Sequence, residues 1–194
     1  MKTKEVLKLI FVNPFEKIAG WQALGLGLIA VMIAALIGSY NGVYFDGAFD
    51  FHPTGNPYSL WLALELLGIG LASIIIMFLL AGVFFSKNFR VIDVIGTTTL
   101  AKIPYLFLVL TGFIRLPEIL NDANAITENP YEIFSVSFIV FILLATTITI
   151  WLFALHYHAF KVSLNIRKNL RVVVFIFALL FAEILSKVII YYIF

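Results

Sequence analysis

The stretch LWLALELLGIGLASIIIMFLLAGVFF occupies residues 60–85 and contains a single charged side chain, Glu65. A helix needs roughly 20 predominantly apolar residues to cross the hydrocarbon core of a bilayer. This stretch exceeds that length and predicts a transmembrane helix. The whole chain has the same character, because 62% of its 194 residues are hydrophobic and 12% are charged. Soluble domains have roughly 45–50% and 25%, so a soluble globular fold is excluded.

Four further segments predict membrane spans. The first follows Asn13-Pro14, because asparagine is a good helix N-cap and proline suits the first helical position. The fold class is therefore all-α, a polytopic integral membrane protein with one membrane domain over residues 14–194. The predicted spans cover residues 14–39, 60–85, 94–114, 133–158 and 171–194.

The third span is the least apolar of the five. Its first half contains the threonines 97–99 and Lys102. Pro104 has no backbone N–H, so the carbonyl of Leu100 loses its helical partner and a kink is expected. Elsewhere, small residues that let helices approach closely recur at every fourth position. They are Ala30, Ala34 and Gly38 in the first span and Gly68 and Ala72 in the second.

Two segments outside the spans have patterns of their own. Residues 1–13 combine lysines with apolar residues at helical spacing, which predicts a cytoplasmic amphipathic helix on the membrane surface. Residues 40–59 form a loop, in which Asp46-Gly47 predicts a small hairpin over residues 43–51.

The distribution of Lys and Arg indicates the orientation, because these residues are enriched in cytoplasmic loops. One side of the predicted membrane domain carries Lys2, Lys4, Lys8, Lys17, Lys87, Arg90, Lys161, Arg167, Lys168 and Arg171. The other side carries Arg115 with Asp46, Asp50, Glu118, Asp122, Glu128 and Glu132. The N-terminus is therefore expected in the cytoplasm and the C-terminus outside.

The chain resembles the Ypt-interacting protein (Yip) domain family. The likeness rests on five spans with this orientation and on a polar stretch ending in proline, residues 96–104 (GTTTLAKIP). Eukaryotic members are implied to bind Rab-type GTPases through a long N-terminal region and an Asp-Leu-Tyr-Gly-Pro signature, and this chain has neither. It is similar to the short prokaryotic members. The resemblance therefore implies a bacterial inner-membrane protein and does not carry Rab-type GTPase binding to this chain.

Glu65, Glu183 and Lys187 are the charges predicted deepest in the hydrocarbon. Lys187 follows Glu183 by four residues, so the two share a helix face and can pair. An ionisable group in a membrane is costly unless it has a partner. The cluster therefore indicates either a proton, ion or substrate site, or a structural pair that fixes the second span against the fifth; Lys187 can alternatively extend to the external interface.

A second polar cluster is predicted at the cytoplasmic face. It comprises Asp93, Thr97, Lys102, His156 and His158. Histidines two residues apart on a helix point about 200° from each other and cannot chelate one metal ion. The cluster is interpreted mainly as an interface anchor, with a catalytic or metal-binding role as the alternative.

Asp46, Asp50 and His52 in the external loop are weak candidates for a metal site, since aspartates are also common in turns. The chain has no cysteine, no phosphate-binding glycine loop and no nucleophile or zinc motif. No cofactor and no enzyme activity are therefore expected.

The sequence favours a non-enzymatic membrane-organising or interaction scaffold of the Yip type. The alternative is a small transporter or channel that uses Glu65, Glu183 and Lys187, because broken spans often line substrate sites. An intramembrane metal enzyme is a third, more remote reading. Expected partners are the lipid bilayer and either further copies of the chain or another membrane protein. The net charge of +2 gives no reason to expect nucleic-acid binding.

Overall fold

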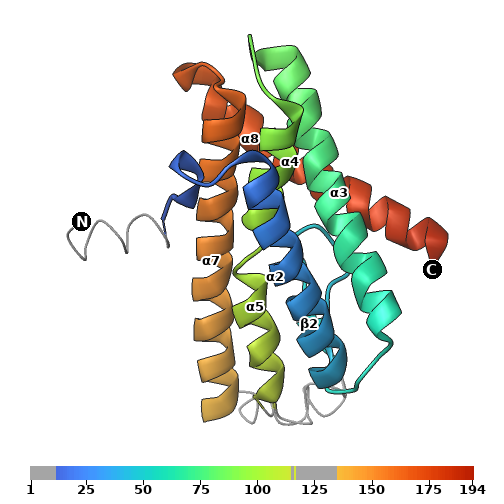
Figure 1. The fold of residues 1–194 in the computed structure, drawn as a ribbon. Helices are drawn as coiled ribbons and strands as arrows, with labels where there is room; N and C mark the ends of the chain where they lie inside the picture. Colours follow the sequence, from blue (N-terminus) through green and yellow to red (C-terminus); the bar gives the residue numbers. More distant parts are fainter. Residues whose placement is uncertain (1–11, 115, 117–134) are drawn as a thin grey trace.

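The computed structural model describes residues 12–114, 116 and 135–194. Within them, five helices are long and apolar enough to cross a membrane, which confirms the predicted helical class (Figure 1). The expected surface helix falls on residues outside this described part. The five spans are α2 (Gly20–Asn41), α3 (Leu60–Phe85), a broken span over Val91–Phe113, α7 (Val136–Leu164) and α8 (Lys168–Ile193).

The predicted start of the first span at residue 14 is wrong. Pro14–Glu16 form a short 3-10 turn, η1, and α2 begins at Gly20. The Asn13 side chain does not cap a helix but donates to the Glu16 carboxylate at 2.7 Å. Gly20 has a φ of +56°, a conformation that glycine adopts without steric cost. The chain therefore turns at Gly20 before entering the span.

The third span is broken where the sequence predicts a kink. It consists of α4 (Val91–Leu100), a turn over residues 101–104, α5 (Tyr105–Leu108) and the 3-10 helix η2 (Val109–Phe113). The Leu100 carbonyl accepts from the N–H of Ile103 at 3.1 Å, in place of the amide that Pro104 lacks. The helical ladder therefore tightens into a turn at this point.

This polar span lies at the centre of the bundle. Within an apolar 18-residue stretch of this span, 72% of the residues are buried. The corresponding stretches of the other four spans have 22% to 50% of their residues buried. Thr97 and Thr99 each donate to the carbonyl four residues earlier, at 2.7 Å. Neighbouring helices shield these threonines from lipid, and the hydroxyls of Thr97 and Thr99 have partners, whereas the buried hydroxyl of Thr98 has none among the described residues.

The connection between α7 and α8 is shorter than predicted. α7 continues to Leu164 instead of ending near residue 158, and α8 begins at Lys168 instead of 171. The extension is stable because Phe160 and Leu164 are fully buried. Asn165, with a φ of +48°, ends α7. After it, α8 packs mainly on α3 and crosses the bundle obliquely (Figure 1).

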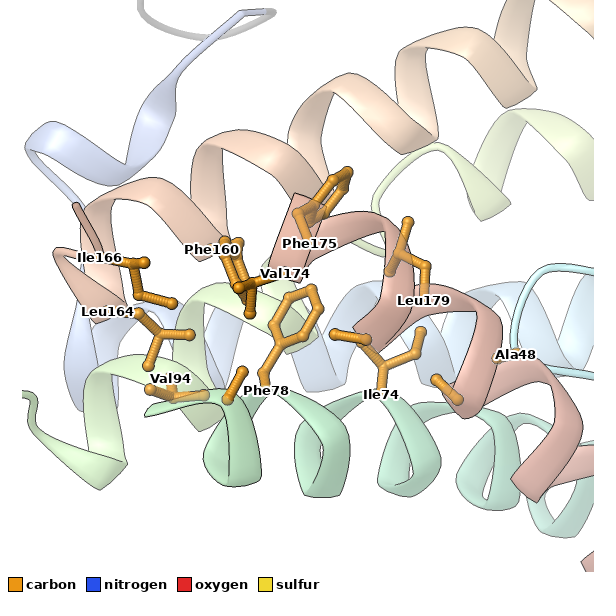
Figure 2. Close-up of a cluster of buried hydrophobic side chains, with 13 residues drawn as sticks. Ala48, Ile74, Phe78, Val94, Phe160, Leu164, Ile166, Val174, Phe175 and Leu179 are labelled. Carbon is orange, nitrogen blue, oxygen red and sulfur yellow. The ribbon is translucent and has the colours of Figure 1, made fainter. Parts of the chain in front are cut away.

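A cluster of aromatic rings joins α3, α7 and α8. The ring of Phe78 lies 4.8 Å from that of Phe160 and 6.1 Å from that of Phe175, measured between centroids. Figure 2 shows these three rings together, with Ala48 at the edge of the same cluster. Ala48 belongs to the loop between α2 and α3, so part of that loop is inside the protein.

The loop pairs two short strands, β1 (Val43–Tyr44) and β2 (His52–Pro53), in antiparallel register. A hairpin is therefore present, but its predicted tight turn at Asp46-Gly47 is wrong. Residues 45–51, which we call the inner loop, instead enter the bundle as a re-entrant segment. The Tyr58 hydroxyl donates to the Val43 carbonyl at 2.6 Å, and burial raises the pKa of Tyr58 to about 12, so the donor proton is retained at neutral pH.

A substitution at Gly27 tests how closely α2 packs against α4 of the third span. A Cβ at this position would lie 2.8 Å from the Thr99 carbonyl oxygen, whereas a Cβ at Gly25 would meet nothing within 4 Å. We expect Gly27→Ala to destabilise the fold by about 1–3 kcal/mol through overpacking. Gly25→Ala should leave the melting temperature in detergent nearly unchanged. Equal melting temperatures for the two variants would contradict this account of the interface.

Candidate functional site

One peptide group of the inner loop lies between a cation and an anion. The N–H of Phe49 donates to Oε2 of Glu183 at 2.9 Å. The carbonyl of Ala48, in the same peptide bond, accepts from Nζ of Lys102 at 2.6 Å and from the hydroxyl of Tyr105 at 2.8 Å. The peptide dipole is thus favourably aligned with both charges, because its positive end faces the carboxylate and its negative end the ammonium.

Lys102 is the most unusual residue of the described chain. Its side chain is 2% exposed, and among the described residues it forms no ion pair within 4 Å. Its ammonium lies 4.1 Å from the ring centroid of Tyr105 and 5.2 Å from that of Phe49. Within the described part of the chain, cation–π contacts and hydrogen bonds therefore stabilise the charge of Lys102. Lys102 lies in the turn over residues 101–104 that interrupts the third span, and this turn places its side chain inside the bundle.

Two glycines allow the inner loop to lie this close to the helices. A Cβ on Gly70 of α3 would stand 2.6 Å from the carbonyl oxygen of Gly47, and a Cβ on Gly47 would overlap the carboxylate of Glu183. Ser186 adds a further anchor, since its hydroxyl accepts from the N–H of Ala48 at 2.9 Å. Both α3 and α8 therefore hold the loop in place.

The predicted pair Glu183–Lys187 is brought together at 4.0 Å, but Lys187 has closer partners. Its Nζ lies 2.7 Å from Asp50 and 3.2 Å from Asp46, both on the inner loop. Glu65 is partly buried on α3, and no hydrogen bond or ion pair joins it to Glu183 or Lys187 in the described part of the chain. The three intramembrane charges of the sequence interpretation therefore do not form one cluster.

The weak metal candidates gather around the same lysine. Asp46 and Asp50 both bind Lys187, and Nδ1 of His52 lies 3.7 Å from Asp46. The ammonium of Lys187 thus lies beside the two carboxylates that a divalent cation would need. Across the described residues, no group of three His, Asp or Glu side chains is arranged to hold a metal ion.

The predicted cytoplasmic-face cluster is divided between two places. Asp93 is ion-paired with Arg90 at 3.6 Å, and Thr97 is bonded to the Asp93 carbonyl, so these residues belong to the first turns of α4. His158 is partly buried beside Tyr157. Of the five predicted residues, which all lie in the described part of the chain, only Asp93 and Thr97 are therefore bonded to each other at the start of α4.

The other two, Lys102 and His156, meet in the interior. His156 is fully buried in α7, its Nδ1 is 2.9 Å from the Leu152 carbonyl, and its ring lies edge-on to Phe49 at 5.3 Å. Its Nε2 has no partner in the described structure. Lys102 and His156 thus both lie against Phe49 of the inner loop, and both are buried and not on the surface as predicted.

The sequence interpretation missed Tyr105, Ser186 and the buried tip Ala48-Phe49. Two of these have a local signal, because Tyr105 directly follows the helix-breaking Pro104 and Ser186 directly precedes Lys187. The tip has none, since two apolar residues in a short loop also suit a lipid contact. Its entry into the bundle depends on contacts with helices distant in the chain.

The fold and this site define a class: a bundle with five helices long and apolar enough to cross a membrane, in which Lys102 and Glu183 hold a loop that enters the bundle. No protein-family model, curated protein or solved structure matches the chain. The resemblance to the Yip domain family stays a prediction.

The contacts of Lys187 predict a measurable coupling. Lys187→Met leaves Asp50 without its closest partner, and Asp50→Asn removes that unpaired charge. We expect the double variant to be more stable than the sum of the single changes implies, with a coupling of about 0.5–1 kcal/mol for this partly exposed pair. Thermal or denaturant unfolding in detergent measures it. Lys187→Met with Asp93→Asn is the matched control and should give a coupling near zero; equal couplings in both cycles would contradict the assignment.

Proposed function

We propose that the chain is a small non-enzymatic membrane transporter in which Lys102 is the central ionisable group and a proton is the coupled species. The observation that carries this proposal is a fully buried lysine without an ion pair among the described residues, located in a broken transmembrane helix. Intramembrane ionisable residues usually mark ion or proton pathways. Substrate and ion sites of transporters typically lie where helices are interrupted.

Polar groups connect this lysine with the protein surface. Asp50 and Lys187 have side chains that are 54% and 41% exposed. Glu183 follows at 4.0 Å from Lys187, and the Ala48–Phe49 peptide links Glu183 to Lys102. The series therefore runs from exposed groups to the centre of the bundle.

The inner loop is the moving part in this proposal. Ala48 is fully buried, so the loop fills the route and has to shift before an ion passes. A proton lost from Lys102 or gained by Glu183 weakens a charge-assisted hydrogen bond to the loop. Protonation and loop position are therefore coupled, which is the requirement for proton-linked alternating access.

A flux assay tests the proposal directly. Purified protein in liposomes with a pH gradient should carry protons above the rate of empty vesicles, and Lys102→Met and Glu183→Gln should each lower this rate about tenfold or more. Glu65→Gln is the matched control, because Glu65 lies outside the polar series, and it should keep the wild-type rate. Melting temperatures establish that each variant is folded. Wild-type protein without flux under gradients of protons, sodium or potassium would overturn the proposal.

The same proposal includes an orientation in a bacterial inner membrane, with the N-terminus in the cytoplasm. Its support is the position of the basic residues next to helix ends opposite the inner loop, Lys87, Arg90, Lys161, Arg167, Lys168 and Arg171.

A reporter fused after Phe194 checks this orientation. Positive residues are retained on the cytoplasmic side, so a periplasm-dependent reporter such as alkaline phosphatase should be active there. The same reporter fused after Lys87 should be inactive. The reversed pattern would show that the inner loop faces the cytoplasm.

A scaffold of the Yip type is the second candidate, and one observation favours it. Gly68 and Ala72 lie on an outward face of α3, where a Cβ at Gly68 would meet nothing within 4 Å. Such small-residue faces allow another transmembrane helix to pack closely. The partner would be a further copy of the chain or another membrane protein. Flux-negative protein that forms stable oligomers, disrupted by Gly68→Leu, would favour this candidate over transport.

A further inference from the structure

An apolar groove with an acidic end opens on the side of the bundle between α7 and α8. It has a volume of about 390 Å³ and is lined by Phe49, Asp50, Phe153, Leu179, Leu180 and Glu183. This volume falls within the range of roughly 300–1,000 Å³ that is typical of small-molecule sites. Phe153 and Leu180 are exposed, so the groove is accessible from the position of the hydrocarbon.

A second groove of about 470 Å³ continues the apolar surface along α7 and the loop. The two grooves share Phe153, which forms a wall of each. Apart from His52 and two threonines, the second groove is lined by apolar residues, among them Phe141, Ile142 and Ile150. A molecule with a polar end and a long apolar chain matches this arrangement.

The acidic end has a surplus of one negative charge. Asp46, Asp50 and Glu183 carry three formal negative charges, while Lys102 and Lys187 carry two positive ones, so the difference is one. A ligand with a single ammonium group complements this surplus. The side chains of Asp50 and Glu183 line the groove itself and remain 54% and 30% exposed.

Exposed aromatic residues support an interfacial depth for this end. Tyr and Trp are enriched where headgroups meet the hydrocarbon. Tyr40 and Trp61 are exposed at the ends of α2 and α3 that the loop connects, and Tyr191 and Tyr192 are exposed in the last turn of α8. Lys187 precedes Tyr191 by four residues, or about 6 Å along the helix, so a headgroup at this depth would reach the acidic end of the groove.

We propose that this groove binds one phospholipid that has a primary ammonium headgroup, of the phosphatidylethanolamine type. The lipid ammonium would contact Asp50 and Glu183 from the groove that they line, the phosphate would face Lys187, and an acyl chain would lie against Phe153 and Leu180. A primary ammonium has three N–H donors for these carboxylates, whereas a trimethylated one has none. The site shares Asp50 and Glu183 with the polar series of the proposed transport function, but its test measures lipid binding through protein stability and needs no proton flux.

Thermal unfolding in detergent with added lipid tests the proposal, since a ligand of the folded state raises its stability. The probes are dioleoyl phosphatidylethanolamine, phosphatidylcholine and phosphatidylglycerol at equal concentrations. We expect the first to bind about tenfold more tightly than the other two, as charge-assisted hydrogen bonds to carboxylates imply. Equal stabilisation by phosphatidylethanolamine and phosphatidylcholine in the wild type would overturn the proposal without any variant.

Two pairs of variants locate the site. Asp50→Asn should remove the preference for phosphatidylethanolamine, while Asp93→Asn, which removes a carboxylate paired with Arg90 outside this cluster, should keep it. Leu180→Trp should block binding of all three lipids, whereas Ile184→Trp, also exposed on α8, should not. Each variant is first compared in lipid-free detergent to establish that it folds. A preference that survives both Asp50→Asn and Leu180→Trp would place the lipid elsewhere and contradict the assignment.

Discussion

The structure depends on how the peptide bond between Ala48 and Phe49 is stabilised inside a membrane protein. A backbone amide in hydrocarbon is costly unless both its N–H and its C=O are bonded, and a loop has no helical ladder to supply the partners. Glu183 supplies the acceptor, and Lys102 with Tyr105 supplies the donors. The same contacts also stabilise the buried ammonium of Lys102 and the partly exposed carboxylate of Glu183, because each faces the complementary end of the peptide dipole. Loop and charges therefore stabilise each other.

Several other features follow from this requirement. The third span has to present a lysine away from an ideal helix, and Pro104 provides the break that allows it. A span with this polarity is tolerated only at the centre of the bundle, where α2 and α3 shield it from lipid. Gly70 and Gly47 allow the loop and the helix to approach this closely. A Cβ on Gly70 would stand 2.6 Å from the carbonyl oxygen of Gly47, and a Cβ on Gly47 would overlap the carboxylate of Glu183. The least apolar of the five spans is thus the most buried one.

The sequence predicts the helices well because hydropathy and length are local properties. It gives the bounds of α3 correctly and locates the break near Pro104. It fails at Gly20, where a turn replaces the expected helix start, and at residues 159–164, where basic neighbours conceal buried aromatic contacts. The site is less predictable, since Lys102 lies 54 residues from Ala48 along the chain. Charge patterning finds Glu183 and Lys187 as partners, but a single sequence does not indicate that Ala48 of an acidic loop is buried inside the bundle.

The position of α8 has a consequence for assembly during synthesis. Of the described helices, α8 is the most C-terminal, yet it carries Glu183 and Ser186, which bind the loop that follows the first span. While the earlier helices emerge from the ribosome, the amides of Ala48 and Phe49 have no partner and water has to hydrate them. The loop therefore remains outside the hydrocarbon until α8 is inserted and packs on α3. The final position of the loop therefore forms only after α8 has packed on α3 and brought Glu183 and Ser186 to it.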